Sequence, residues 1–314
     1  MAGAGDIVSR RVLPALRALG EEPVFLWARD PARAAAAAGR WGIAASGDDP
    51  RGLVTGTDAV YVATPVVHHV PLAATALDAG LPVLIEKPLA GSLRPGGAAL
   101  AAGGAGAGVA YYRRLAPVVR EVRRELARWS PDRVDVHFRC TFEPGPGHPM
   151  RWRTDPAVSG GGVLTDAGSH RLDLLLMLFG RPARVSARLG RRFAAGAERR
   201  AEVELGWPGL RARCLMEWSG GPPVDRVAFH GGGRSLVLDP LDSGKLTATG
   251  PEGTRRVRYE PDANPHLPLV ADFVAAVAAG RPPVCPVAEA VLVDDVIVAA
   301  HRSDALGGAP VRAW

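Results

Sequence analysis

Lysine is scarce in this sequence, and one of the two lysines follows a short apolar run. Of the 38 residues that are lysine or arginine, only Lys87 and Lys245 are lysine. Lys87 follows the apolar run 83–85 and precedes Pro88, which cannot donate to a sheet ladder and so ends a strand. A lysine ammonium is compact and its pKa can move, whereas arginine stays charged. The position suggests a chemical role for Lys87, with a lysine retained by drift as the alternative.

A second set of polar residues falls at helical spacing within residues 160–180. Read as an α-helix, Asp166, His170 and Asp173 lie on one face, and leucines form an apolar stripe on the other. An aspartate one turn before a histidine can orient the imidazole ring and stabilise its charge when the ring takes a proton. The spacing favours a general base here, and an exposed helix face with Asp166 as its N-cap is the alternative.

Two glycines, Gly3 and Gly5, precede an apolar-periodic segment at residues 7–19. The periodicity predicts a helix that ends at Gly20. A glycine pair before a helix is similar to the first half of a dinucleotide loop, where the backbone approaches a pyrophosphate. The strand that normally precedes such a loop is central in its sheet, and here it is apparently missing. We therefore expect about five to seven apolar residues to be encoded upstream of Met1.

Short strands and helices alternate in the first third of the chain. Strands are predicted at residues 23–27, 59–63 and 82–85, and helices at residues 31–41 and 72–79. This alternation predicts right-handed crossovers and a doubly wound parallel sheet. Because ligands bind outside the carboxyl ends of the strands in such a sheet, the polar residues at these ends should share one edge.

After about residue 115 the pattern changes from alternation to consecutive strands. A helix over residues 115–129 and a strand over residues 134–142 come first. Further strands are predicted at residues 184–192, 199–205, 210–218, 226–230, 234–238 and 255–259, and two closing helices at residues 269–279 and 288–303. Consecutive strands indicate an antiparallel sheet. We therefore predict a dinucleotide-binding domain at residues 1–114 and a substrate domain at residues 115–314.

Composition limits the kind of protein this can be. The chain is 47% hydrophobic and 22% charged, which is typical of a globular protein. Its net charge of +6 comes from scattered arginines without interleaved aromatic residues, so we expect no nucleic-acid partner. Apolar runs are too short for a membrane span and no signal peptide is evident, so we expect a cytoplasmic protein. The three cysteines lack metal-binding or disulfide spacing, so no metal is expected.

Several short motifs, taken in order, resemble the family of glucose-fructose oxidoreductase, inositol dehydrogenase and MocA. The motifs are Ala63-Thr64-Pro65 with His69, Glu86-Lys87-Pro88-Leu89, Arg114 with Pro117, Trp152-Arg153, Gly160-Gly161-Gly162, and Asp166 with His170. The resemblance runs from Gly3 to the end of the chain. It implies an N-terminal Rossmann domain and a C-terminal α+β domain with an open, mainly antiparallel sheet. In this family that sheet often joins subunits, which implies a homo-oligomer, a dimer or a tetramer.

The resemblance also implies an enzyme that oxidises a secondary alcohol, or reduces the ketone, on a sugar, cyclitol or related polyol with NAD(P). His170 looks like the general acid/base, Lys87 like the cation that polarises the reacting oxygen, and Asp166 like their acidic partner. The residues carried over as cofactor-binding are Gly3, Gly5, Asp6, Ile7, Arg29, Ala63, Thr64, Pro65, His69, Glu86, Lys87, Trp152 and Arg153. The alternative is a non-catalytic relative that binds a sugar or nucleotide as a scaffold or sensor.

The strand that ends at Trp27 bears on which dinucleotide is preferred. In this fold an acidic side chain after that strand accepts the ribose 2′-hydroxyl group, whereas an arginine accommodates a 2′-phosphate. Here Ala28 and Arg29 follow the strand, and Asp30 comes next. The sequence therefore predicts a preference for NADP, with NAD possible because of Asp30.

Overall fold

The computed structural model describes residues 1–93, 96–102 and 106–313, which form two compact units. The first unit comprises Met1–Tyr112 and Asp262–Val291, and the second comprises Arg113–Pro261 and Leu292–Trp314. In the predicted division, 1–114 and 115–314, each domain is one continuous stretch of sequence. The structure differs because residues 262–291 return to the first unit.

Hydrogen bonds from side chains to backbone carbonyl oxygens hold the returning segment to the first unit. The side-chain amide of Asn264 donates to the carbonyl oxygen of Arg11 at 2.8 Å, and Nη1 of Arg11 donates to the carbonyl oxygen of Ala263 at 3.2 Å. The helix that follows, α8 (Leu267–Ala279), packs against the first helix of the chain. Sequence periodicity predicted α8 as a helix but carried no signal for its partner.

The first unit is a doubly wound α/β unit. Its elements are η1 (Val8–Val12), α1 (Leu13–Ala18), β1 (Phe25–Trp27), α2 (Pro31–Trp41), β2 (Ala45–Gly47), η2 (Pro50–Val54), β3 (Val60–Val62), η3 (Val66–His68), α3 (His69–Asp78), β4 (Val83–Ile85), α4 (Gly97–Ala102), β5 (Ala107–Val109) and α8. Strands β1 and β2 pair in parallel, as do β3, β4 and β5 in that order. The predicted Rossmann-type parallel sheet is confirmed.

Residues 1–3 take the central position between β1 and β3. Ala2 forms parallel bridges with both Trp27 and Val62, and the N–H group of Gly3 donates to the carbonyl oxygen of Trp27 at 2.8 Å. These residues join the two groups of parallel strands into one sheet. The first strand is therefore very short in this chain, whereas the sequence predicted that it was missing.

The α-amino group of Met1 is buried in this central position and donates to the carbonyl oxygen of Phe25 at 2.9 Å. Burial lowers the pKa of this ammonium from 8.0 to about 5.

The second unit is built on an eight-stranded sheet. Its strands are β6 (Arg133–Cys140), β7 (Arg184–Arg192), β8 (Glu198–Trp207), β9 (Leu210–Trp218), β10 (Val224–Gly231), β11 (Arg234–Leu238), β12 (Lys245–Gly250) and β13 (Gly253–Arg258). Their order is β13-β12-β11-β10-β6-β9-β8-β7, and only β6 and β9 pair in parallel among the neighbours. The mainly antiparallel sheet is confirmed.

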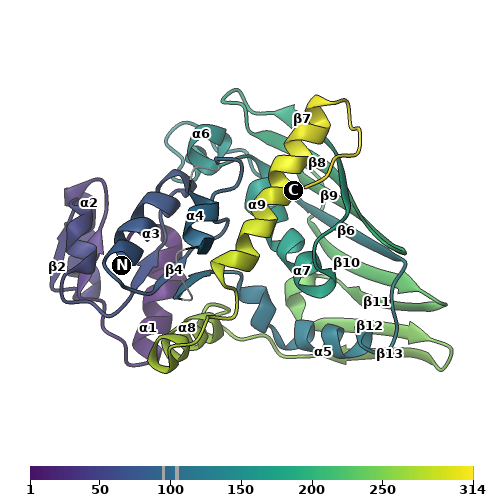
Figure 1. Ribbon diagram of the computed structural model, residues 1–314, viewed down its shortest axis with the longest axis horizontal. Helices are drawn as coiled ribbons and strands as arrows, with labels where there is room; N and C mark the ends of the chain where they lie inside the picture. Colours follow the sequence, from purple (N-terminus) through teal and green to yellow (C-terminus); the bar gives the residue numbers. More distant parts are fainter. Residues whose placement is uncertain (94–95, 103–105, 314) are drawn as a thin grey trace. The chain divides into compact units, whose positions relative to one another are not determined.

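Helices cover one face of this sheet. The helical elements are η4 (Tyr112–Leu115), α5 (Pro117–Leu126), η5 (Arg151–Thr154), α6 (Pro156–Ser159), η6 (Leu164–Gly168), α7 (Ser169–Phe179), η7 (Leu241–Ser243) and α9 (Val287–Ala305), which begins in the first unit. Within the second unit, α5 and α7 lie on one side of the strands, and the other face is open (Figure 1). Along β6 the burial alternates accordingly, with Val134 and Val136 buried and Asp135 and His137 partly exposed. Among the described residues, no helix is long and apolar enough to cross a membrane.

All three cysteines are free. Cys214 and Cys285 are buried, as expected for small apolar residues. Cys140 is only half-buried, because it is the last residue of β6.

Candidate active site

The loops after β3 and β4 in the first unit carry Ala63, Thr64, Pro65, Glu86 and Lys87. A buried histidine, His69, connects these loops: its Nδ1 atom lies 2.8 Å from the carbonyl oxygen of Pro88 and its Nε2 atom 2.9 Å from that of Thr64. Burial lowers the pKa of His69, although both carbonyl oxygens favour the charged ring. The ring is 1% exposed, so His69 holds the two loops together from inside.

A buried carboxylate lies directly before Lys87. Glu86 accepts a hydrogen bond from the hydroxyl group of Tyr61 at 2.9 Å and lies 3.3 Å from Nε2 of His266. Burial opposes ionisation of this carboxyl, but the hydrogen bonds and the charge of His266 outweigh it and lower the pKa of Glu86. The backbone N–H of half-buried Lys87 also donates to Glu86 at 3.3 Å. An anion is therefore fixed beside Lys87, and sequence reasoning did not find Tyr61 or His266.

The glycine loop has the shape that a dinucleotide phosphate needs. Gly3 has φ +114°, and a Cβ atom there would lie 2.2 Å from the carbonyl oxygen of Ala63. A Cβ atom at Gly5 would meet nothing within 4 Å, so the backbone at the start of the helix borders open space. The Oγ1 atom of Thr64 is buried and has no hydrogen-bond partner in the described chain. The other predicted residues of this loop are Asp6 and Ile7. These features fit a bound dinucleotide.

Of the two charged residues after β1, Asp30 caps the following helix and Arg29 does not. The carboxylate of Asp30 caps α2, where it accepts from the backbone N–H groups of Ala32 and Arg33 at 3.0 and 3.2 Å. Arg29 is exposed. Burial, and to a lesser extent the charge of Arg29, lower the pKa of His68. One carboxylate oxygen, Oδ1, thus caps the helix, and the guanidinium of Arg29 is exposed at the strand end.

Asp166 and His170 lie where a π-helical turn passes into an α-helix. The turn η6 covers Leu164–Gly168, and α7 begins at Ser169. The sequence predicted one regular α-helix with Asp166, His170 and Asp173 on a shared face. The regular helix is wrong, because residues 164–168 form a π turn ahead of His170, and Asp173 is buried. Such π turns occur frequently at functional sites.

Asp166 has an arginine partner in the same unit. Nη1 of Arg153 lies 3.0 Å from Oδ2 of Asp166, and the guanidinium is 5.5 Å from the ring centre of Trp152. Both side chains of the ion pair are partly exposed. The structure therefore places Trp152 and Arg153, which were predicted to bind the cofactor, in the second unit, with Arg153 beside Asp166.

Two buried carboxylates hold the helix that carries His170. Nε and Nη2 of Arg114 donate to Oδ1 of Asp173 at 3.0 and 2.6 Å, and both side chains are almost fully buried. Glu198 in β8 accepts from the backbone N–H groups of Gly162 and Leu164 at 2.8 and 3.1 Å, at the positive end of the helix. Burial raises the pKa of Glu198. These contacts fix the start and the middle of the His170 helix.

The glycine motif before this helix serves packing. A Cβ atom at Gly162 would lie 2.0 Å from the carbonyl oxygen of Glu198. Only glycine allows β8 to approach so closely, which explains the predicted Gly160-Gly161-Gly162 motif. Glu198 itself gave no signal in the sequence, because it stands in a run of charged residues at the start of a predicted strand.

Two family models match the chain. One is described as "Oxidoreductase family, NAD-binding Rossmann fold" and matches residues 1–102, and the other as "GFO/IDH/MocA C-terminal domain" and matches residues 130–237. The first match covers β1 to β4 of the first unit, and the second covers most of the large sheet of the second unit.

Curated relatives and solved structures agree with this match. Levoglucosan dehydrogenase of Pseudarthrobacter phenanthrenivorans is 31% identical over 170 residues, 50% of this chain and 43% of the relative. The dTDP-3,4-didehydro-2,6-dideoxy-alpha-D-glucose 3-reductase of Streptomyces violaceoruber is 32% identical over 232 residues, 67% of this chain and 62% of the relative. The matches thus span about half the length of these curated relatives, between 43% and 62%.

The fold is also that of a solved levoglucosan dehydrogenase in complex with NADH. That structure superposes with a TM-score of 0.86 at 20% identity and covers 100% of this chain and 98% of its own. Since two models of one family match the two units, this chain belongs to the GFO/IDH/MocA family of oxidoreductases, with an NAD-binding Rossmann fold.

Proposed function

We propose that the protein transfers hydride between NAD(P) and a secondary alcohol or ketone of a sugar, cyclitol or related polyol. The observation that carries this proposal is that a chain with an NAD-binding family fold contains Lys87, Asp166 and His170. Lys87 follows a strand of the parallel sheet, and Asp166 and His170 lie in one helical segment. The relatives support the substrate class, because their names describe a dehydrogenase of an anhydrosugar and a reductase of a nucleotide-linked sugar.

The side chains divide the proton chemistry between them. The nicotinamide, when bound, supplies the centre that accepts or releases hydride. His170 removes the hydroxyl proton as the carbinol is oxidised and returns it in reduction, and Asp166 stabilises the charged ring. Lys87 donates a hydrogen bond to the reacting oxygen and stabilises its developing negative charge. The ionised Glu86 next to Lys87 balances that ammonium.

Gly3, Gly5 and the loop after β3 would hold the dinucleotide. The open backbone at Gly5 suits the pyrophosphate, and the buried hydroxyl group of Thr64 offers a hydrogen bond to the nicotinamide half.

The preference for NADP rests on Arg29. Because the carboxylate of Asp30 is used as a helix cap, the exposed guanidinium of Arg29 is the group available to a 2′-phosphate. Arg29→Ala should weaken NADPH binding about 10- to 100-fold, the scale of one lost charge-assisted hydrogen bond, and leave NADH binding nearly unchanged. Fluorescence titration with both nucleotides measures this. Tighter binding of NADH, unaffected by Arg29→Ala, would refute the preference.

Nicotinamide fluorescence followed by a turnover screen tests the proposed function itself. Purified protein should bind NADPH and then oxidise or reduce at least one member of a panel of hexoses, anhydrosugars, inositols and their keto forms. Binding without turnover on any of them would favour the non-catalytic scaffold or sensor.

We also propose a homo-oligomer, a dimer or a tetramer, that forms through the open face of the large sheet. Charges on this face already neutralise one another across strands, as where Nε of Arg213 lies 3.5 Å from Glu204, so a second copy would meet little unpaired charge. Sedimentation velocity should give at least the dimer mass, and Leu215→Arg within this face should give monomers. A monomeric wild-type chain would refute the proposal. The cytoplasmic location stays a prediction.

A further inference from the structure

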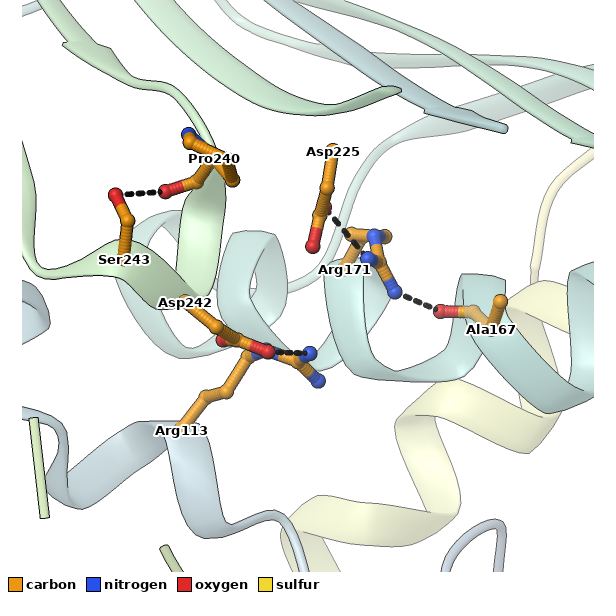
Figure 2. Close-up of polar contacts among 7 residues, drawn as sticks. All are labelled: Arg113, Ala167, Arg171, Asp225, Pro240, Asp242 and Ser243. Carbon is orange, nitrogen blue, oxygen red and sulfur yellow. Dashed lines mark hydrogen bonds and ion pairs between the residues drawn. The ribbon is translucent and has the colours of Figure 1, made fainter. Parts of the chain in front are cut away.

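A buried arginine directly follows the proposed base, His170. Arg171 is 2% exposed, and two of its side-chain nitrogens have close partners. Nη1 donates to the backbone carbonyl oxygen of Ala167 at 2.7 Å, and Nη2 donates to Oδ1 of Asp225 at 2.6 Å (Figure 2). The guanidinium thus connects its own helix to a strand of the sheet.

The first of these contacts closes the π turn. Ala167 belongs to η6 (Leu164–Gly168), the turn that also carries Asp166. Hydrogen bonds in such a turn run between residues five apart, and the turn persists only where its surroundings support it. The contact from Arg171 ties the end of the turn to the first turn of α7.

The other contacts fix this turn to the sheet. Asp225 lies in β10, and the guanidinium carbon of Arg171 lies 4.2 Å from the ring centre of Phe138 in β6. Because β10 and β6 are neighbours in the eight-stranded sheet, one side chain anchors the turn to two adjacent strands. Movement of this helical segment along the sheet would break the contacts of Arg171 with Asp225 and Phe138.

A purely packing role explains this arrangement poorly. A buried ion pair commonly contributes no more stability than apolar residues of similar volume, because the desolvation cost is large. Here Arg171 binds both Ala167 in the turn and Asp225 in the sheet, and the turn carries Asp166 and directly precedes the helix of His170. We propose that Arg171 is a positioning residue that fixes the η6 turn against β10 and β6 and so directs Asp166 and His170. This inference rests on the proposed hydride transfer.

The same cluster contains a matched control. Nε and Nη2 of Arg113 donate to the two carboxylate oxygens of Asp242 at 2.7 and 2.5 Å (Figure 2). Arg113 is also almost fully buried, but Asp242 belongs to the short turn η7 and half of its side chain is exposed. This second pair therefore resembles the Arg171 pair in chemistry, although its carboxylate lies in a turn of its own, apart from η6.

The test compares the double variants Arg171→Met/Asp225→Leu and Arg113→Met/Asp242→Asn. Each removes both charges of a pair, so neither leaves a buried charge without its counterion. We expect kcat to fall about 10- to 100-fold in the Arg171 pair variant, the scale of a catalytic group displaced by about 1 Å, with the Kd of the cofactor unchanged. The Arg113 pair variant should keep kcat within about twofold. Arg171→Lys should recover part of kcat, since one ammonium can replace one of the two contacts.

A structural readout accompanies the kinetics. The Cε1–H resonance of His170, assigned with His170→Gln, should shift and its titration midpoint should change in the Arg171 pair variant only. This measurement needs no substrate, so it decides the positioning role even if wild-type protein turns over none of the sugars. Unchanged His170 titration and unchanged kcat in the Arg171 pair variant would overturn the inference. If that variant does not fold, Arg171→Lys decides by the same two readouts.

Discussion

Replacing Lys87 or His170 with alanine is expected to lower turnover by at least about 100-fold, the usual scale for a lost acid/base group. The reason lies in the proposed mechanism, in which His170 carries the proton of the reacting oxygen and Lys87 stabilises its charge. The double variant should lose little more than the worse single variant, because groups that act as a unit are not additive.

Lys245→Ala is the matched control for Lys87→Ala. Lys245 is the other lysine of the chain, and it is exposed at the first residue of β12. Turnover of this variant should equal that of wild type. Steady-state kinetics at saturating cofactor measure all of these variants, and full turnover by Lys87→Ala/His170→Ala would remove both residues from the mechanism.

Arg114→Met should be the most destabilising of the substitutions considered. The exposed fractions of the Arg114 and Asp173 side chains are 4% and 1%, so removal of the arginine takes the charge of this ion pair away from a buried carboxylate. Such a change costs about 3–5 kcal/mol. The double variant Arg114→Met/Asp173→Leu should recover most of this loss, because it removes the uncompensated charge as well.

The control for this prediction is an exposed ion pair. Arg258 and Glu260 are 57% and 76% exposed, and Arg258→Ala should leave the free energy of unfolding nearly unchanged. Urea denaturation gives all four values. If Arg114→Met costs no more than Arg258→Ala, water reaches Asp173, and the pair is not the anchor of α7 described above.

Strand and helix positions could be predicted well wherever one face of the element is buried. The predicted strands 184–192, 210–218 and 234–238 match β7, β9 and β11, because burial of every second residue gives each strand an alternation of apolar and polar residues. The strand β12 (Lys245–Gly250) was missed, since only Leu246 is buried in it and the rest reads as a polar turn. Propensity gave no help at the π turn, whose geometry depends on the buried contacts around it.

The site could be predicted only in part, for a similar reason. Lys87 and His170 stand in local motifs that the sequence displays directly. Glu198 and His266 do not, because their partners lie far away in the chain: Glu198 binds Gly162, and His266 lies beside Glu86. Only the folded chain brings such groups together. In the sequence alone, these charged or polar residues look like ordinary surface residues.

Transfer of deuterium is the most direct test of the central claim, that this chain moves hydride between a nicotinamide and a sugar carbon. The purified 314-residue protein would be incubated with NADPH or NADH carrying two deuterium atoms at C4 and with a panel of keto sugars, and the products analysed by mass spectrometry. We predict a product heavier by one mass unit, with deuterium on the carbinol carbon, and none with the Lys87→Ala/His170→Ala variant. A wild-type protein that binds the nucleotide but places no deuterium on any of the sugars would contradict the account.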